Sequence, residues 1–188
     1  VNSFDHVLVE GNSAAANADP LVYDMMAAFY TACSSFIAQN FGARKKKRIL
    51  QTYLICLFYS FITSLVLGVG IYLARYPFLY LFTSDKAVVE AGITRLSIMA
   101  LSYSASAFMD ASIAASRGLG KTAVPTFVVV MGSCVFRIIW IYTIFAYFHT
   151  IQSLYILYVF SWGITAIAEN IYFFHVYRHT LTEKKELC

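Results

Sequence analysis

The sequence contains a long block without any charged residue, from Ile49 to Ala74. An α-helix rises about 1.5 Å per residue, so this block is long enough to cross the roughly 30 Å hydrocarbon core of a bilayer. Similar apolar blocks recur along the 188 residues, of which only 13% are charged, about half the share in an ordinary soluble domain. The blocks are too long for the strands of a membrane barrel. We therefore expect an all-α, polytopic membrane protein.

Five such blocks predict five transmembrane helices, packed in one transmembrane lobe over residues 13–178. The approximate spans are 13–40, 49–74, 88–116, 122–148 and 151–177. Pro20 is expected to start or kink the first span, because proline cannot donate the backbone hydrogen bond of a helix interior. Residues 1–12 are predicted to be an external segment with the end of a preceding helix, and the polar start at Val1 suggests a fragment of a larger protein.

Basic residues gather at alternate ends of the spans and predict the topology. Short loops rich in Lys and Arg are retained on the cytoplasmic side of a membrane. The larger basic set comprises Arg44–Arg48, Arg117, Lys121, Arg178, Lys184 and Lys185, and the opposing set comprises Lys86 and Arg75. We expect a multi-pass protein of the plasma (inner) membrane, with residues 179–188 as a cytoplasmic tail. Because the basic run lies between two spans, it does not indicate binding to nucleic acid.

The third span carries a carboxylate, Asp110, inside an otherwise apolar helix. At 100° per residue, one polar stripe also contains Tyr103, Ser106 and Arg117. Ionisable side chains inside membrane spans are costly in lipid and are candidates for function. The stripe is expected to face protein or a water-filled cavity. The alternative to a functional role is that Asp110 makes a structural hydrogen bond between packed helices.

A second polar stripe follows the first span. It comprises Asn17, Asp24, Thr31 and Ser35. Asp24 is the candidate functional acid of this span. Asp19 points away from the stripe near the polar end of the span, and we interpret it as an interfacial carboxylate in water.

Two further charged residues lie within the predicted spans. Arg137, near the middle of the fourth span, either pairs with an intramembrane acid or donates to helix carbonyls as a structural clamp. The acids available to it are Asp24, Asp110 and Glu169. For Glu169, in the inner part of the last span, a structural pairing or a water-exposed cytoplasmic vestibule is favoured over substrate contact.

Several segments of the chain resemble the multidrug and toxic compound extrusion (MATE) transporters. They are GNSAAANAD, SSFIAQNFGARKKKRI, the MDA and SRGLGKTAVP pieces that follow Phe108, and FRIIW followed by SWGITAIAE. Each segment is weak alone, but their order is specific and the resemblance extends over nearly the whole chain. In that family twelve helices form two six-helix lobes. The chain would be the C-terminal half, with the end of the seventh helix in Val1–Gly11, helices eight to twelve following, and the N-terminal lobe missing.

The resemblance implies a secondary active antiporter that exports drugs or organic cations in exchange for Na⁺ or H⁺. Asp110 falls where family members place an acid on the tenth helix, which implies a role in coupling, with Na⁺ at Asp110 as one alternative. Ser106 stands where some relatives have a tyrosine one turn before this acid, and the partner acid on the seventh helix lies outside the chain. The coupling ion therefore stays open, and no cofactor besides it is expected.

The predicted substrate cavity combines both polar stripes with the arginine of the fourth span. Its residues are Asn17, Asp24, Thr31, Ser35, Tyr103, Ser106 and Arg137, with Glu169 as a further candidate. Two intramembrane acids favour a small cationic or aromatic cargo over the phosphates of a lipid-linked saccharide flippase, the alternative transporter. A third alternative, a non-transporting membrane scaffold, would need neither stripe.

Enzyme activity is not expected. The short loops contain no nucleophile with its base, no metal constellation and no phosphate cradle. The expected partners are the missing N-terminal lobe, membrane lipid and the cargo.

Overall fold

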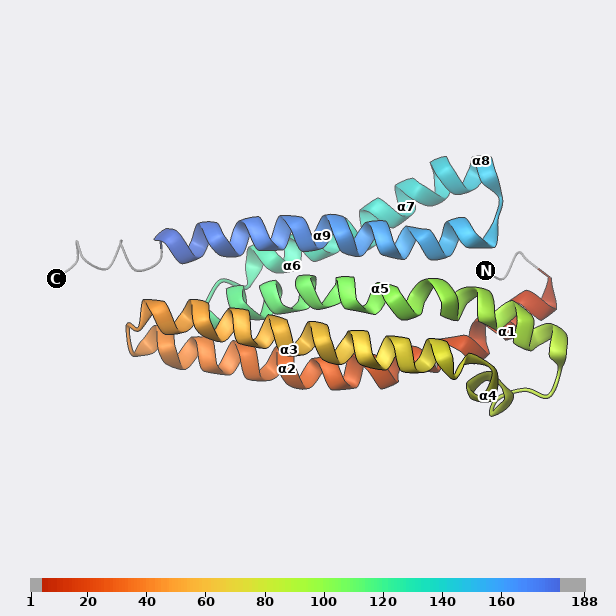
Figure 1. Cartoon of the computed structure of the whole chain (residues 1–188). Helices are drawn as coiled ribbons and strands as arrows, with labels where there is room; N and C mark the ends of the chain where they lie inside the picture. The colour runs from red at the N-terminus through yellow and green to blue at the C-terminus, as the bar shows by residue number, and fades with distance from the viewer. Residues whose placement is uncertain (1–4, 180–188) are drawn as a thin grey trace.

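The computed structural model describes residues 5–179, and within that range the chain is helical and contains no strand (Figure 1). The four longest helices are α2 (Ala18–Gly42), α3 (Lys46–Leu73), α5 (Lys86–Gly118) and α9 (Ile151–His179). The short helices are α1 (His6–Ala16) and α4 (Arg75–Tyr80). Between α5 and α9 runs one irregular helix: α6 (Ala123–Val130), the π-helical segment η1 (Met131–Val135), α7 (Phe136–Trp140), the π-helical segment η2 (Ile141–Phe145) and α8 (Ala146–Phe148). The prediction of an all-α protein is confirmed.

Four helical segments are long and apolar enough to cross a membrane. They are His6–Gly42, Lys46–Leu73, Ala123–Phe148 and Ile151–His179. A fifth is added if α5 is taken as one span, because its parts Lys86–Ala100 and Ser102–Gly118 meet at an angle of 43°. The five spans expected from the sequence agree with this upper count.

Helix α1 covers residues that were expected to lie before the first span. Asp5 caps α1, because its Oδ1 accepts a hydrogen bond from the His6 backbone N–H at 2.9 Å. Residues 6–12 are therefore helical, and their assignment to an external segment with the end of a preceding helix stays a prediction. The start or kink predicted at Pro20 lies slightly earlier, at Asn17, where α1 ends and α2 begins. A proline favours a break in the turn before it, because it has no backbone N–H to donate to that turn. The remaining predictions for residues 1–4 and 180–188 fall outside the described residues.

Helix α5 lies at the centre of the bundle and packs against α1, α2, α3 and α9 (Figure 1). Small side chains on α5 make this possible, among them the buried Ala100, Ala107 and Ala111. Opposite them on α3 is Gly68, where an added Cβ atom would lie 2.0 Å from the Ala100 carbonyl oxygen. The two backbones therefore approach as closely as small residues allow in packed membrane helices.

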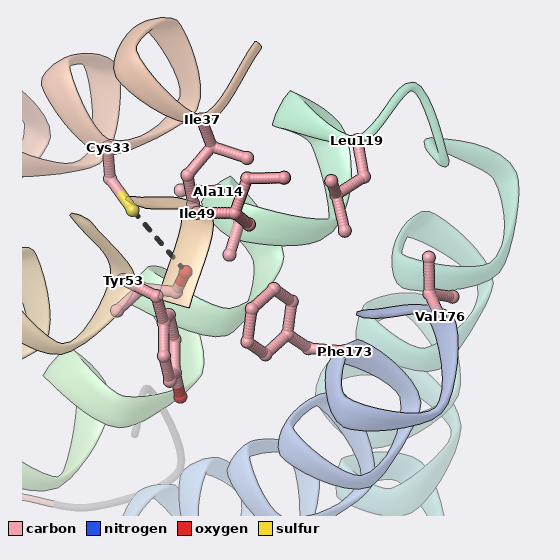
Figure 2. Packing of buried hydrophobic residues seen from close by; sticks show 10 residues of the cluster. Cys33, Ile37, Ile49, Tyr53, Ala114, Leu119, Phe173 and Val176 are labelled. Carbon is pink, nitrogen blue, oxygen red and sulfur yellow. Dashed lines mark hydrogen bonds between the residues drawn. The ribbon is translucent and has the colours of Figure 1, made fainter. Parts of the chain in front are cut away.

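A buried apolar cluster joins four of the long helices (Figure 2). The labelled residues are Cys33, Ile37, Ile49, Tyr53, Ala114, Leu119, Phe173 and Val176. Tyr53 also carries a polar link, since its hydroxyl donates to Asn170 Oδ1 at 2.6 Å and lies 3.1 Å from Ser112 Oγ. This link satisfies the phenol inside the bundle and ties α3 to both α5 and α9.

The two ends of the bundle differ in charge. The turn after α2, the turn after α5 and the end of α9 lie together (Figure 1). They carry the larger basic set of the sequence, as far as residues 5–179 include it, so we call this the basic end. Lys46 Nζ there donates to the Arg178 carbonyl at 3.2 Å. The opposite end carries α4, and we call it the α4 end. The clustering of basic residues at one end agrees with the sequence-based topology, whereas the side of the membrane that each end faces stays a prediction.

Candidate functional site

The polar stripe of α5 faces α2 along its length. Tyr103 and Ser106 are fully buried, and the Ser106 hydroxyl donates to the Tyr103 carbonyl at 2.8 Å and lies 3.9 Å from Met26 Sδ. Further along, Arg117 donates to the Tyr30 hydroxyl. Tyr103 and Ser106 therefore face protein, namely α2, as expected, whereas Arg117 is exposed.

Asp110 lies in the middle of this interface. It lines a small enclosed space between α2, α3 and α5, whose other walls include Met26, Tyr30, Cys33 and Cys56. The carboxylate is half-buried, and it makes no hydrogen bond or ion pair with any residue in the range 5–179. A structural hydrogen bond, the alternative weighed from the sequence, is therefore not formed within the described chain.

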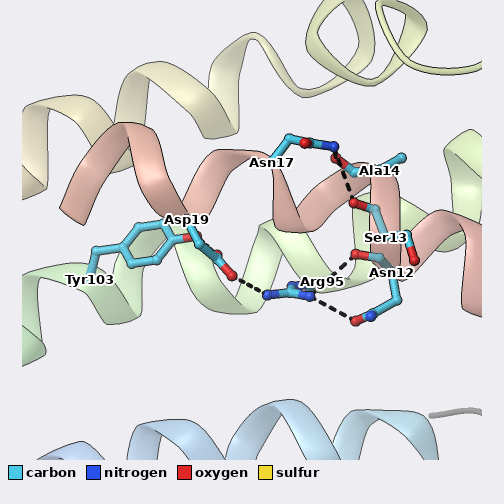
Figure 3. Close-up of polar contacts among 7 residues, drawn as sticks. All are labelled: Asn12, Ser13, Ala14, Asn17, Asp19, Arg95 and Tyr103. Carbon is cyan, nitrogen blue, oxygen red and sulfur yellow. Dashed lines mark hydrogen bonds and ion pairs between the residues drawn. The ribbon is translucent and has the colours of Figure 1, made fainter. Parts of the chain in front are cut away.

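A second acid, Asp19, is fully engaged at the α4 end of the same interface (Figure 3). Asp19 forms an ion pair with Arg95 and accepts a hydrogen bond from the Tyr103 hydroxyl. Arg95 also donates to the Asn12 side-chain oxygen at 2.9 Å and to its backbone carbonyl at 3.2 Å. The exposed fractions of the Arg95 and Asp19 side chains are 11% and 28%. This network joins the break between α1 and α2 to α5.

The interpretation of Asp19 as an interfacial carboxylate in water was therefore wrong. On α2, Asp19 follows the three- and four-residue spacing of the buried residues Val22 and Met26, so it lies on the packed face of the helix. The sequence contained a signal for this pairing, since Asp19 lies away from the exposed polar stripe and so on the packed face of the helix. An acid on a packed face needs a cationic partner. Arg95 supplies that partner from α5.

The polar stripe of the first span lies on the opposite face of the helix. Its members Asn17, Asp24, Thr31 and Ser35 are all exposed. They point away from the buried face of α2 and do not join Tyr103 and Ser106 in one cavity. The single substrate cavity predicted from the sequence is therefore not formed within residues 5–179.

Arg137 lies elsewhere again, at a cavity between α5, α7 and α9. Its Nε donates to Ser161 Oγ at 3.3 Å, and its Cζ lies 4.3 Å from the centre of the Tyr158 ring. Among the described residues it pairs neither with Asp24, Asp110 or Glu169 nor with a helix carbonyl, so both predicted roles were wrong. Arg137 faces α9 at Tyr158 and Ser161, whereas Glu169 lies two turns further along that helix, and Asp24 and Asp110 lie on other helices.

Glu169 also departs from the expectation. Its side chain is fully buried, and neither carboxylate oxygen has a hydrogen-bond partner among the described residues. The pairing and the water-exposed vestibule considered from the sequence are both absent from this part of the chain.

These features define the class of protein. Apolar helices long enough to cross a bilayer enclose one acid that is paired, Asp19, and two that have no partner in the described chain, Asp110 and Glu169. This is the architecture of a polytopic membrane protein with ionisable groups between its helices. Residues 1–143 match the family model named MatE, and the chain belongs to that family of membrane transporters. The comparison with curated proteins found no match.

Proposed function

We propose that this chain is part of a secondary active antiporter that exports drugs or small organic cations in exchange for Na⁺ or H⁺. The observation that carries the proposal is Asp110, a half-buried carboxylate inside the bundle with no hydrogen bond or ion pair to any residue of the described chain. An intramembrane carboxylate of this kind can exchange a proton or a cation, whereas one already neutralised by an arginine cannot do so without losing that partner.

The proposed exchange uses the two charge states of Asp110. The ionised carboxylate attracts a cation, and uptake of H⁺ or Na⁺ removes that attraction and favours release of the cargo. Each ligand then stabilises a different arrangement of the two lobes, which is how binding drives alternating access in transporters built from paired repeats. The N-terminal lobe, proposed as the partner of this chain, would supply the other wall of the pathway.

The exposed stripe of α2 supports a cationic cargo. Its face carries Asp24 together with Asn17 and Thr31, and all three residues are exposed. We propose that this face lines the route on the side of the missing lobe. Replacing Asp24 by Asn is then expected to change which cationic compounds are exported without changing the stability of the protein.

A lipid-linked saccharide flippase is the second candidate, and the arginines of the α4 end are the observation in its favour. Phosphate groups are bound by arginine through paired, charge-assisted hydrogen bonds. Arg95, however, is already compensated by Asp19, which leaves Arg137 as the arginine of that cavity without an acid in the described chain. The unpaired Asp110 gives the cation antiporter the stronger support.

Transport by the full-length protein in proteoliposomes tests the proposal. Ethidium efflux is measured under imposed H⁺ and Na⁺ gradients for the wild type and for Asp110→Asn, which keeps the size of the side chain but cannot exchange a charge. We expect gradient-driven efflux to fall at least tenfold. Asp85→Asn is the matched control, because Asp85 is an exposed helix cap and Asn caps equally well. Unchanged, gradient-driven efflux by the Asp110→Asn protein would refute the coupling role.

A further inference from the structure

A cavity of about 240 Å³ at the α4 end lies between α5, α7 and α9. Its polar walls are formed by Asn12, Arg95, Arg137, Tyr155 and Tyr158. The cavity is separate from the enclosed space beside Asp110, which lies between α2, α3 and α5. The proposed coupling chemistry therefore does not use it.

The two arginines of this cavity differ in their charge balance. Arg95 is compensated by Asp19 and held in place by two hydrogen bonds to Asn12. Arg137 has no carboxylate within 4.0 Å among residues 5–179, and its contacts are a hydrogen bond to Ser161 and a cation–π contact with Tyr158. The cavity wall therefore carries one uncompensated positive charge. Charged side chains inside membrane proteins are rare and mark ligand pathways when they face a cavity without a protein partner.

The guanidinium of Arg137 is oriented by its surroundings. The Ser161 hydroxyl accepts its Nε–H, while the same hydroxyl donates to the Gly132 carbonyl at 2.8 Å. The Tyr158 ring lies against the guanidinium at a cation–π distance of 4.3 Å. Ser161 occupies the Nε–H group, and the Tyr158 ring fixes the plane of the guanidinium. The N–H groups on the two terminal nitrogens of Arg137 therefore remain for a ligand.

The helix that carries Arg137 is irregular on both sides of it. The π-helical segments η1 and η2 flank α7, in which Arg137 is the second residue. Insertions of this kind change the direction of the following side chains and occur frequently at functional sites in helices. Gly132, within η1, lies so close to α9 that an added Cβ atom would be 2.0 Å from Thr165 Oγ1, so this part of the helix is held tightly against α9.

We propose that Arg137 binds an oxyanion, a carboxylate or a phosphate, on a ligand whose adjoining apolar or aromatic part lies against Tyr155 and Tyr158. A planar guanidinium matches the two oxygens of a carboxylate or phosphate with parallel hydrogen bonds. The site goes beyond the proposed exchange of cations at Asp110. Its ligand is either the acidic group of a transported molecule or the head group of an anionic lipid, since both present the same oxyanion.

Binding to the full-length transporter tests the site. The purified protein, in nanodiscs of phosphatidylcholine, is titrated calorimetrically with benzoate, with phenyl phosphate and with benzyl alcohol as the uncharged analogue. We expect both anions to bind at low salt, to bind more weakly at high salt, and to bind more tightly than benzyl alcohol. Absence of anion binding, or equal binding of benzyl alcohol, would overturn the proposal.

Two substitutions locate the binding. Arg137→Gln is expected to weaken binding of both anions about tenfold or more, because it removes a charged hydrogen-bond donor pair. Arg75→Gln is the matched control, since Arg75 also stacks on tyrosine rings, Tyr72 and Tyr76, but does not line the cavity. Should Arg137→Gln fail to fold, Arg137→Lys keeps the charge but loses the fork, and an affinity below that of the wild type is expected. Wild-type affinity in either Arg137 variant contradicts the assignment.

A comparison of two lipid compositions distinguishes the two possible sources of the oxyanion, a lipid head group and a transported acid. Nanodiscs that contain phosphatidylglycerol are compared with the neutral ones. If a lipid head group is the ligand, phosphatidylglycerol competes with benzoate and stays bound to the wild type, but not to Arg137→Gln, after delipidation. If a transported acid is the ligand, the lipid leaves benzoate affinity unchanged. Asp110→Asn keeps anion binding in both cases, so failure of the coupling proposal is distinguishable from failure of this one.

Discussion

The carboxylate of Asp19 on α2 and the guanidinium of Arg95 on α5 form an ion pair inside the bundle (Figure 3). Within residues 5–179 it is the one pair that joins a carboxylate to an arginine or lysine within 4.0 Å. The pair lies where α1 ends and α2 begins, and Asn12 and Tyr103 complete it from either side. The consequence is that charge, as well as apolar packing, fixes the broken first span against the central helix.

The first prediction concerns the loss of that pair. Asp19→Asn leaves Arg95 charged and without its acid, and removal of one partner from a buried pair is strongly destabilising. We expect a loss of about 3 kcal/mol in the free energy of unfolding, measured by thermal denaturation of the full-length protein in detergent. Asp24→Asn, on the exposed face of the same helix, is the control and should leave stability within about 0.5 kcal/mol.

A double substitution separates pairing from other effects of the change. Exchange of the two charges, Asp19→Arg with Arg95→Asp, is expected to restore part of the stability that either single change removes. Destabilisation by the double change equal to the sum of the two single changes would show that the two side chains do not interact.

The elements of this fold could be predicted from the sequence because each depends on local pattern. The charge-free block from Ile49 to Ala74 corresponds to α3, and the stripe of Tyr103 and Ser106 faces protein as its spacing indicated. The partners of the charged residues could not be predicted in the same way. Asp19 and Arg95 are far apart in sequence, and only the packing of α2 on α5 brings them together.

Arg137 shows the same limit. Helical spacing places it within a span but cannot say which neighbour it faces, because two π-helical segments beside it alter the regular 100° progression. The start of α1 at His6 shows a different limit. The polar residues before Gly11 have no pattern of a membrane span, and the structure shows that Asp5 caps a helix over His6–Ala16, which the break at Asn17 separates from α2.

The close approach of α3 and α5 gives the second prediction. In Gly68→Ala the new methyl group would meet the Ala100 carbonyl oxygen at 2.0 Å, so one backbone must move. We expect a loss of about 2 kcal/mol or more in the free energy of unfolding. Gly70→Ala is the matched control on the same helix, since no atom lies within 4 Å of the corresponding position. Thermal denaturation of both variants measures the difference, and equal melting temperatures would show that the contact yields without cost.

The third prediction is the side of the membrane that each end of the bundle faces. Lys47 at the basic end and Ser84 near the α4 end are both exposed and can be replaced singly by cysteine in a protein without its native cysteines. In intact cells a membrane-impermeant maleimide should label Ser84→Cys, while Lys47→Cys should react only after permeabilisation, because basic loops stay in the cytoplasm. The reverse pattern would invert the orientation of every helix.

The last prediction contrasts Glu169 with Asp110 and Asp19. Glu169 is fully buried on α9 and has no hydrogen-bond partner in the described chain. Replacement by the neutral isostere in Glu169→Gln should therefore remove no ion pair, and we expect stability within about 1 kcal/mol of the wild type or above it.

The same variant should keep gradient-driven efflux, unlike Asp110→Asn. Thermal denaturation and proteoliposome transport measured side by side on these two variants and on Asp19→Asn distinguish three kinds of intramembrane acid. Asp19→Asn loses stability, Asp110→Asn loses coupling, and Glu169→Gln loses neither. A loss of more than about 2 kcal/mol in Glu169→Gln would contradict this prediction and indicate a partner for the carboxylate outside residues 5–179, since breaking a buried ion pair costs that much or more.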